Sequence, residues 1–94
     1  MNPLLYTGVM KTVKTLFFAS AKQSVGLTES VISLEKDNYL GRELLDLIIQ
    51  QFRELEELRP SLTLAVNEEY ISLDDTLHAE TIFEVAVIPP LSGG

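Results

Sequence analysis

The chain has 94 residues, of which 46% are hydrophobic, so it has material for one domain with a single core. Acidic residues outnumber basic ones by 14 to 7, and the formal charge of −7 disfavours a nucleic-acid partner, whose phosphates call for a basic face. The absence of cysteine excludes disulfides, thiolate metal sites and a catalytic or persulfide-carrying thiol. The single histidine, His78, excludes a histidine-rich metal centre built from this chain alone.

The N-terminal 21 residues end in Ala-Ser-Ala, which superficially resembles a signal-peptidase site. Lys11 and Lys14 interrupt the apolar stretch before it, whereas a secretory core needs about 7–15 consecutive apolar residues. No run approaches the ~18–20 apolar residues that cross a bilayer. We therefore expect a cytoplasmic protein with no membrane partner, in which residues 1–11 form an N-terminal extension.

The first two predicted elements are strands joined as a hairpin. Residues 13–19 are β-branched and aromatic with apolar groups on both faces, which is typical of a buried strand. A short polar stretch with room for one helical turn follows, and Gly26 supplies a turn. Residues 29–35 then alternate with the period of a strand, so we expect them to return along the first strand.

The next segment has the clearest helical periodicity of the chain. Its apolar residues recur at three- and four-residue steps, as a helix requires: Leu44, Leu45, Ile48, Ile49, Phe52, Leu55 and Leu58. We expect Asp37 or Asn38 to cap the start of this helix, and Pro60 to end it at Arg59. Burying each large apolar side chain stabilises the fold by about 1.5–3 kcal/mol. We therefore expect the apolar stripe of this helix to pack on a sheet; the alternative is that the stripe is exposed and binds a partner.

Three extended segments follow the helix. Residues 62–66 form a predicted strand that ends in a polar turn, and residues 70–73 resume the extended structure. Residues 82–88 form the last predicted strand, which two prolines close. One main helix among these strands predicts an α+β roll, in which the helix packs across one face of a sheet.

The last six residues, Pro-Pro-Leu-Ser-Gly-Gly, form a predicted flexible tail at residues 89–94. The prolines hold the backbone extended without amide donors, and the three residues at the end have almost no side chain. Six residues reach about 20 Å when fully extended, so the terminal carboxylate could thread a narrow channel in another protein. A terminal glycine also leaves the carboxyl carbon unobstructed by a Cβ. A frayed end or a linker without function is the alternative.

Four segments carry motifs of one known family: Val-Lys-Thr-Leu-Phe-Phe-Ala at residues 13–19, the helix, Ala-Val-Asn followed by Tyr-Ile at residues 65–71, and Glu-Val-Ala-Val-Ile-Pro-Pro-Leu-Ser-Gly-Gly at residues 84–94. With these segments the chain resembles the small subunits of molybdopterin synthase, which belong to the ubiquitin-like sulfur carriers. The resemblance runs from about residue 12 to 94, and its most specific part is the final strand with the tail. It implies a β-grasp domain with a mixed sheet over residues 12–88.

The resemblance also implies a carrier without catalytic machinery of its own. The Gly94 carboxylate would be adenylated by a separate ubiquitin-activating-type enzyme, which uses ATP and magnesium, and then converted to a thiocarboxylate. The large catalytic subunit would receive the tail and pass the sulfur to a cyclic pterin monophosphate, forming the dithiolene of molybdopterin. The tail residues are Pro89, Pro90, Leu91, Ser92 and Gly93. The synthase would be a heterotetramer of two small and two large subunits, and this chain itself would bind no cofactor or metal.

Alternation along the strands indicates where a partner would bind. If Phe17 faces the helix, Leu16 and Phe18 face the other side of the sheet. We expect Phe18, Tyr70 and Ile88 to form an apolar patch near the root of the tail that anchors the large subunit. The alternative is that Phe18 and Ile88 complete the core.

One connection departs from the family pattern. Relatives usually carry Gly-Asp before the Glu-Val-Ala of the last strand, whereas this chain has Ile82 and Phe83 there. A glycine allows a tight turn with positive φ, so the geometry of the connection is left open. We expect His78, just before it, to be a surface loop residue without an acid–base role.

Other functions remain open at this stage. A carrier of the same fold could serve thiamine synthesis, cysteine synthesis or tRNA thiolation, although thiamine carriers usually lack the Pro-Pro-Leu-Ser stretch. The chain could also be a protein modifier, or a plain interaction domain. A stand-alone enzyme is disfavoured because one histidine, no cysteine and scattered carboxylates offer no nucleophile–base pair.

The charge is unevenly distributed along the chain. Residues 1–28 contain three lysines and no acidic residue, whereas residues 43–84 contain eleven acidic residues and two arginines. This distribution describes either an ordinary solvated surface or an acidic face that steers the domain toward a basic protein partner.

Overall fold

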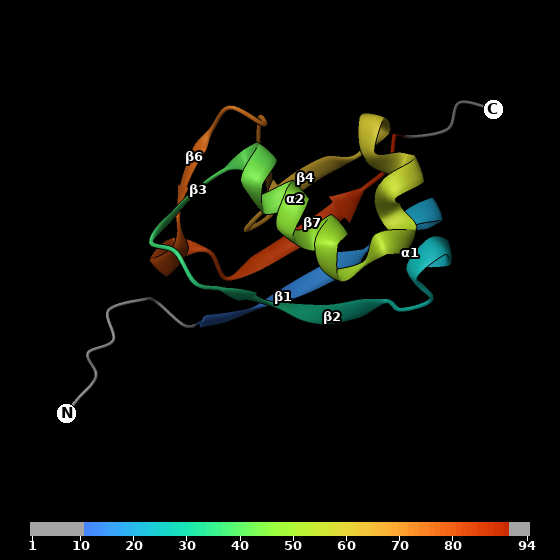
Figure 1. The fold of residues 1–94 in the computed structure, drawn as a ribbon, viewed down its shortest axis with the longest axis horizontal. Helices are drawn as coiled ribbons and strands as arrows, with labels where there is room; N and C mark the ends of the chain where they lie inside the picture. Colours follow the sequence, from blue (N-terminus) through green and yellow to red (C-terminus); the bar gives the residue numbers. More distant parts are fainter. Residues whose placement is uncertain (1–10, 91–94) are drawn as a thin grey trace.

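Residues 11–90, which the computed structural model describes, form two β-sheets and four helical segments (Figure 1). The strands are β1 (Lys11–Phe17), β2 (Glu29–Leu34), β3 (Asn38–Leu40), β4 (Thr63–Val66), β5 (Glu69–Tyr70), β6 (Thr76–His78) and β7 (Glu84–Ile88). The α-helices are α1 (Ala19–Val25) and α2 (Gly41–Gln51), and the 3₁₀ helices are η1 (Arg53–Ser61) and η2 (Ala79–Thr81). Within this range, no helix has the length and apolar character that a membrane span requires.

The larger sheet has five strands in the order β2-β1-β7-β4-β5. β1 pairs in parallel with β7, whereas the other neighbours pair antiparallel. The first and last strands therefore lie side by side in the sheet, and α2 crosses one face of it (Figure 1). The arrangement confirms the predicted α+β, β-grasp roll with a mixed sheet and one main helix. The predicted hairpin of β1 with β2 is confirmed as well.

The core fills the space between α2 and the sheet. The rings of Phe17 and Phe52 meet edge to face, with 4.9 Å between their centroids and 73° between their planes. The largest side chains that are fully buried come from both layers: Val13, Phe17, Ile32, Leu34, Leu44, Ile48, Ile49, Leu55, Leu64, Ile82, Val85 and Val87. The apolar stripe of the predicted helix is thus buried against the sheet, and the alternative of an exposed partner-binding stripe is wrong.

The predicted helix is shorter than expected and is interrupted. Asn38 lies in β3, which pairs with β6, so the chain becomes helical only at Gly41. Phe52, with φ −120° and ψ 79°, then separates α2 from η1 while its ring reaches the core. Pro60 lies inside η1 and does not end a helix at Arg59. The apolar period of three to four residues is the same for an α-helix and for this broken arrangement, so the period alone could not show the break.

Ion pairs fasten η1 to α2 across the break. The guanidinium of Arg59 pairs with Asp46 of α2 at 2.6 Å and with Glu56 of η1 at 2.8 Å. The hydrogen bond with Glu56, followed in size by the one with Asp46, raises the pKa of Arg59. The same bond with Arg59 lowers the pKa of Glu56. The pairs are solvent-exposed, so they orient the segment more than they stabilise it.

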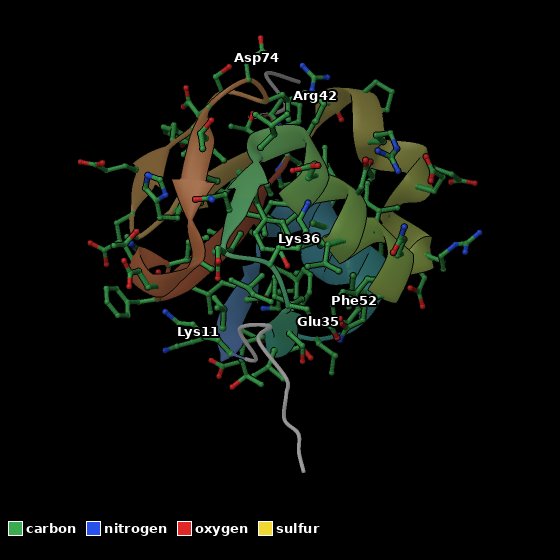
Figure 2. The ribbon with its side chains drawn as sticks, turned by 60° about the vertical axis from the view of Figure 1, so that its left-hand side comes forward. Lys11, Glu35, Lys36, Arg42, Phe52 and Asp74 are labelled. Carbon is green, nitrogen blue, oxygen red and sulfur yellow. The ribbon has the colours of Figure 1, made fainter. Side chains whose placement is uncertain are left out.

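The start of α2 is capped by Glu43, whose side chain accepts a hydrogen bond from the Leu40 N–H at 2.9 Å, and by tertiary contacts, not by Asp37 or Asn38 as the sequence suggested. The N–H groups of Gly41 and Arg42 donate to the carbonyls of Asp75 and Leu73, at 2.8 and 2.9 Å. Arg42 also pairs with Asp74 of the same loop (Figure 2). Carbonyls from a distant loop thus accept hydrogen bonds from helix amides that a local side chain normally caps. The sequence next to the helix gives no sign of these carbonyls.

Several boundaries also differ from prediction. The first predicted strand ends at Phe17, and the polar stretch after it forms the seven-residue helix α1. Of the extended segment predicted at residues 70–73, only its first residue belongs to a strand, β5. The last strand begins at Glu84, two residues later than predicted. His78 lies on the exposed surface but in β6, not in a loop, because it pairs with Asn38 in the short sheet.

Candidate functional site

The face of the five-stranded sheet opposite α2, here called the open face, carries an apolar hollow. The hollow has a volume of about 350 Å³. It is lined by Leu16, Phe18, Ala65, Glu68, Tyr70, Glu84, Ala86 and Ile88. Tyr70 is 72% exposed and Phe18 is 46% exposed, so large apolar side chains border the hollow while remaining accessible. Such exposure of aromatic side chains is typical of a binding surface.

Strand register explains why these side chains meet. Leu16 of β1 lies opposite Ala86 of β7, Ala86 lies opposite Ala65 of β4, and Ala65 lies opposite Tyr70 of β5. Paired residues on neighbouring strands share a face of the sheet, so these four form one row across it. The two alanines form a low floor, and Leu16 and Tyr70 stand at its ends.

Phe18 is held beside the last strand at the point where β1 passes into α1. Its N–H donates to the carbonyl of Val87 at 3.2 Å. The next residue, Ala19, has φ +49°, a left-handed conformation that is uncommon for alanine. The chain turns sharply there, and Phe18 remains on the open face. It is therefore not part of the core.

The structure thus brings Phe18, Tyr70 and Ile88 together around one hollow, beside the end of β7. Their role in binding the large subunit stays a prediction. After Ile88, Pro89 is buried and Pro90 is exposed, so the chain leaves the sheet there. The other predicted tail residues, Leu91, Ser92, Gly93 and Gly94, lie outside the described residues.

The connection into β7 is held by Asn67, which the sequence analysis noted only as part of a motif and a polar turn, without a role for its side chain. Its side-chain Oδ1 accepts hydrogen bonds from the N–H groups of Phe83 and Glu84 at 2.8 and 3.1 Å, and its Nδ2 donates to the carbonyl of Thr81 at 2.6 Å. Asn67 has φ +52°, a region that asparagine tolerates better than most residues. Its position in a polar turn directly after a strand was the signal that could have revealed it.

The departure from the family pattern is accommodated without strain. Ile82 has φ −88°, which any residue can adopt, so the connection does not require a glycine. Its side chain is fully buried in the core. The following residue, Phe83, is 70% exposed. Ile82 is thus a core residue, and Phe83 presents an exposed aromatic ring.

A second hollow lies between β2 and α2, and several of its polar groups are paired with one another. The Tyr39 hydroxyl accepts hydrogen bonds from the N–H groups of Glu35 and Lys36 at 2.8 and 3.1 Å. The Lys36 ammonium pairs with Glu43 at 3.1 Å. Hydrogen bonds from the Leu40 N–H and from Lys36 lower the pKa of Glu43. The hollow includes no residue of β7 or of the tail root, and its groups support the fold.

The residues around His78 do not form a metal site. His78 Nδ1 lies 2.6 Å from Asn38 Oδ1 across the β3–β6 pair, and Asp37 and Glu80 line the same hollow. Within residues 11–90, no group of three histidine, aspartate or glutamate side chains is arranged to hold a metal ion.

Comparison with known proteins places the chain in one group of relatives. A sequence model of the ThiS family matches residues 15–94. The molybdopterin synthase sulfur carrier subunit of Caenorhabditis briggsae is 38% identical over 85 residues, which make up 90% of this chain and all of that protein. The corresponding protein of Arabidopsis thaliana is 34% identical over 87% of this chain and 82% of its own length.

A solved structure shows the same fold. SAMP1 from Haloferax volcanii superposes with a TM-score of 0.71 over 89% of this chain and all of that chain, at 21% sequence identity. At this level of identity the similarity establishes the fold alone, and it agrees with the β-grasp topology described above.

Proposed function

Because the chain belongs to the ThiS family, we propose that it is the sulfur carrier subunit of a molybdopterin synthase. The observation that carries the proposal is the similarity over nearly the whole length to proteins of that name, which reaches 38% identity. The matched region extends to the final Gly-Gly of the chain. A carrier of sulfur for another pathway is less well supported because the relatives at 33–38% identity bear this one name.

The chemistry of the carrier resides in the Gly94 carboxylate. A carboxylate is a poor electrophile, so the activating enzyme first joins it to AMP from ATP, with magnesium, and releases pyrophosphate. A sulfur donor then displaces AMP and leaves a thiocarboxylate. That group is a soft nucleophile at neutral pH, gives its sulfur to the cyclic pterin monophosphate, and returns to a carboxylate by taking oxygen from water.

The geometry of the tail root supports delivery of this group into a partner. β7 ends at Ile88 on the border of the open-face hollow, and Pro90 leads the chain out from there. A partner that receives residues 89–94 in a channel is therefore brought against the open face. Phe18, Tyr70 and Ile88 are the side chains on which the large subunit is anchored, within a heterotetramer of two small and two large subunits.

The same proposal leaves the catalytic groups to other proteins. The large subunit provides the active site, and a ubiquitin-activating-type enzyme binds the ATP and magnesium. The chain itself supplies a reacting group and a surface, in the cytoplasm.

Mass spectrometry of the purified chain tests the proposal. After incubation with the activating enzyme, ATP and a sulfur donor, the C-terminal peptide should gain the mass difference between sulfur and oxygen. A chain without Gly94 is the matched control and should show no gain. A mass gain elsewhere in the chain, or none in the complete chain, contradicts the assignment of Gly94.

A further inference from the structure

The open face carries a further hollow, beside the predicted patch of Phe18, Tyr70 and Ile88. This hollow is lined by Asn67, Glu68, Phe83 and Glu84 and has a volume of about 420 Å³. It shares Glu68 and Glu84 with the apolar hollow at the tail root, so the two hollows adjoin, and together they are called the depression here. At one end lie the aromatic and aliphatic side chains near the tail, and at the other lies Phe83.

Phe83 is exposed yet held in place, which suits a binding contact. The Lys11 ammonium lies 4.9 Å from the centroid of the ring and donates to the carbonyls of Ala79 and Glu80 at 2.9 and 3.1 Å. The backbone N–H of Phe83 is fixed by Asn67 at 2.8 Å. A ring held on an ordered backbone loses little conformational entropy on binding, which favours its use as an anchor. Lys11 is labelled at the lower left of the molecule in Figure 2.

Two carboxylates, those of Glu68 and Glu84, line this end of the depression, and Lys11 and Lys14 lie near it. Among residues 11–90, no lysine or arginine forms an ion pair with Glu68 or Glu84. Lys14 lies directly opposite Glu84 in the pairing of β1 with β7 and shares the open face with it. Both carboxylates therefore lack an ion-pair partner within residues 11–90, and each can pair with a basic side chain of a partner.

We propose that Phe83, Glu68 and Glu84 form a second contact site for the large subunit, which receives a lysine or arginine side chain of that partner. The guanidinium or ammonium lies between the two carboxylates, and its aliphatic stem packs on the Phe83 ring. The tail-root patch receives apolar side chains of the same partner. This inference rests on the proposed function because the large subunit is the partner that the tail enters.

Binding of the purified large subunit to the complete chain tests the inference. Phe83→Ala should weaken the affinity about tenfold, as expected for loss of an aromatic anchor. The double variant Glu68→Gln/Glu84→Gln should also weaken it about tenfold at low salt, and the loss should shrink as the salt concentration rises because screening weakens the charge contact in the wild type.

Matched controls separate this site from general effects. Glu54→Gln/Glu57→Gln removes the same charge from exposed positions on η1, and Leu73→Ala trims an exposed apolar side chain on a distant loop. Both should change the affinity less than about twofold. Circular dichroism and denaturant unfolding establish that each variant is folded.

The outcomes distinguish the inference from the proposed function. If Phe18→Asp weakens binding while the Phe83 and glutamate variants bind like the wild type, the second contact site is wrong and the carrier assignment stands. If the wild-type chain does not bind the large subunit, both are wrong. If sedimentation shows a dimer of the isolated chain that Phe83→Ala dissociates, a second copy occupies this site and the inference is overturned.

Discussion

Phe17 and Phe18 are neighbours of identical chemistry that have opposite positions in the molecule. Phe17 is 1% exposed and packs against Phe52 beneath α2, whereas Phe18 is 46% exposed on the open face. The period of a strand sends them to opposite sides of one sheet. The covered face therefore provides the stability of the domain, and the open face, with its alanine floor, is available for recognition. The two faces can be tested separately by substitution.

The largest expected effect comes from truncating these two rings in turn. Phe17→Ala should lower the free energy of unfolding by about 3–5 kcal/mol because it leaves a cavity under α2. Phe18→Ala should lower it by less than about 1 kcal/mol because its ring is half exposed. Urea unfolding followed by circular dichroism measures both values. Equal losses in the two variants would contradict the division between the faces.

A substitution at Gly41 tests how tightly the loop after β5 packs against the start of α2, on the covered face. A Cβ at this position would overlap the carbonyl oxygen of Ser72 and lie 2.9 Å from the Cα of Leu73. Gly41→Ala should therefore cost about 1–3 kcal/mol in the free energy of unfolding. Gly26→Ala, where φ is +81° but the space is open, should cost about 1 kcal/mol from strain alone. A stabilised Gly41→Ala variant would show that the loop does not constrain the helix.

Asn67 tests the rigidity of the open face near Phe83. Asn67→Ala removes three hydrogen bonds to the segment before β7, and should cost about 1–2 kcal/mol. Asn67→Asp keeps the acceptor oxygen for Phe83 and Glu84 but loses the donor to Thr81, so it should retain part of that stability. Hydrogen exchange at the amides of Phe83 and Glu84 reports the change directly. Unchanged protection in Asn67→Ala would contradict the role given to this side chain.

The smallest effect concerns pH on the covered side. The Leu40 N–H and the Lys36 ammonium hold the pKa of Glu43 below its ordinary value of 4.5. The stability that this carboxylate provides is therefore present above the ordinary value and is lost as the pH falls through the lowered pKa. Glu43→Gln should show a shallower fall in Tm than the wild type between about pH 5 and about pH 3. Parallel curves for the two proteins would contradict this contribution.

The features that the sequence predicted correctly are those set by local periodicity. Alternation in residues 13–18 placed Phe17 and Phe18 on opposite faces of the strand, because a strand has a period of two. It left open whether Phe18 completes the core, and the structure shows that Phe18 is exposed.

The features that prediction missed depend on contacts distant in the sequence. Part of the cap of α2 comes from carbonyls of Leu73 and Asp75, more than thirty positions after Gly41 and Arg42. The pairing of β3 with β6 joins short segments that have no strand pattern of their own. Phe83 became part of the candidate site only when Asn67, sixteen positions earlier, was seen to hold its backbone.

A single-turnover sulfur transfer experiment tests the central claim most directly. The chain is loaded with radioactive sulfur at its C-terminus, purified, and mixed with the large subunit and the cyclic pterin monophosphate. The label should leave the chain and appear in the dithiolene of the pterin product, and a chain without Gly94 should take up no label and yield no product. Product formation by the chain that lacks Gly94, or label that stays on the complete chain while product forms, would contradict the account.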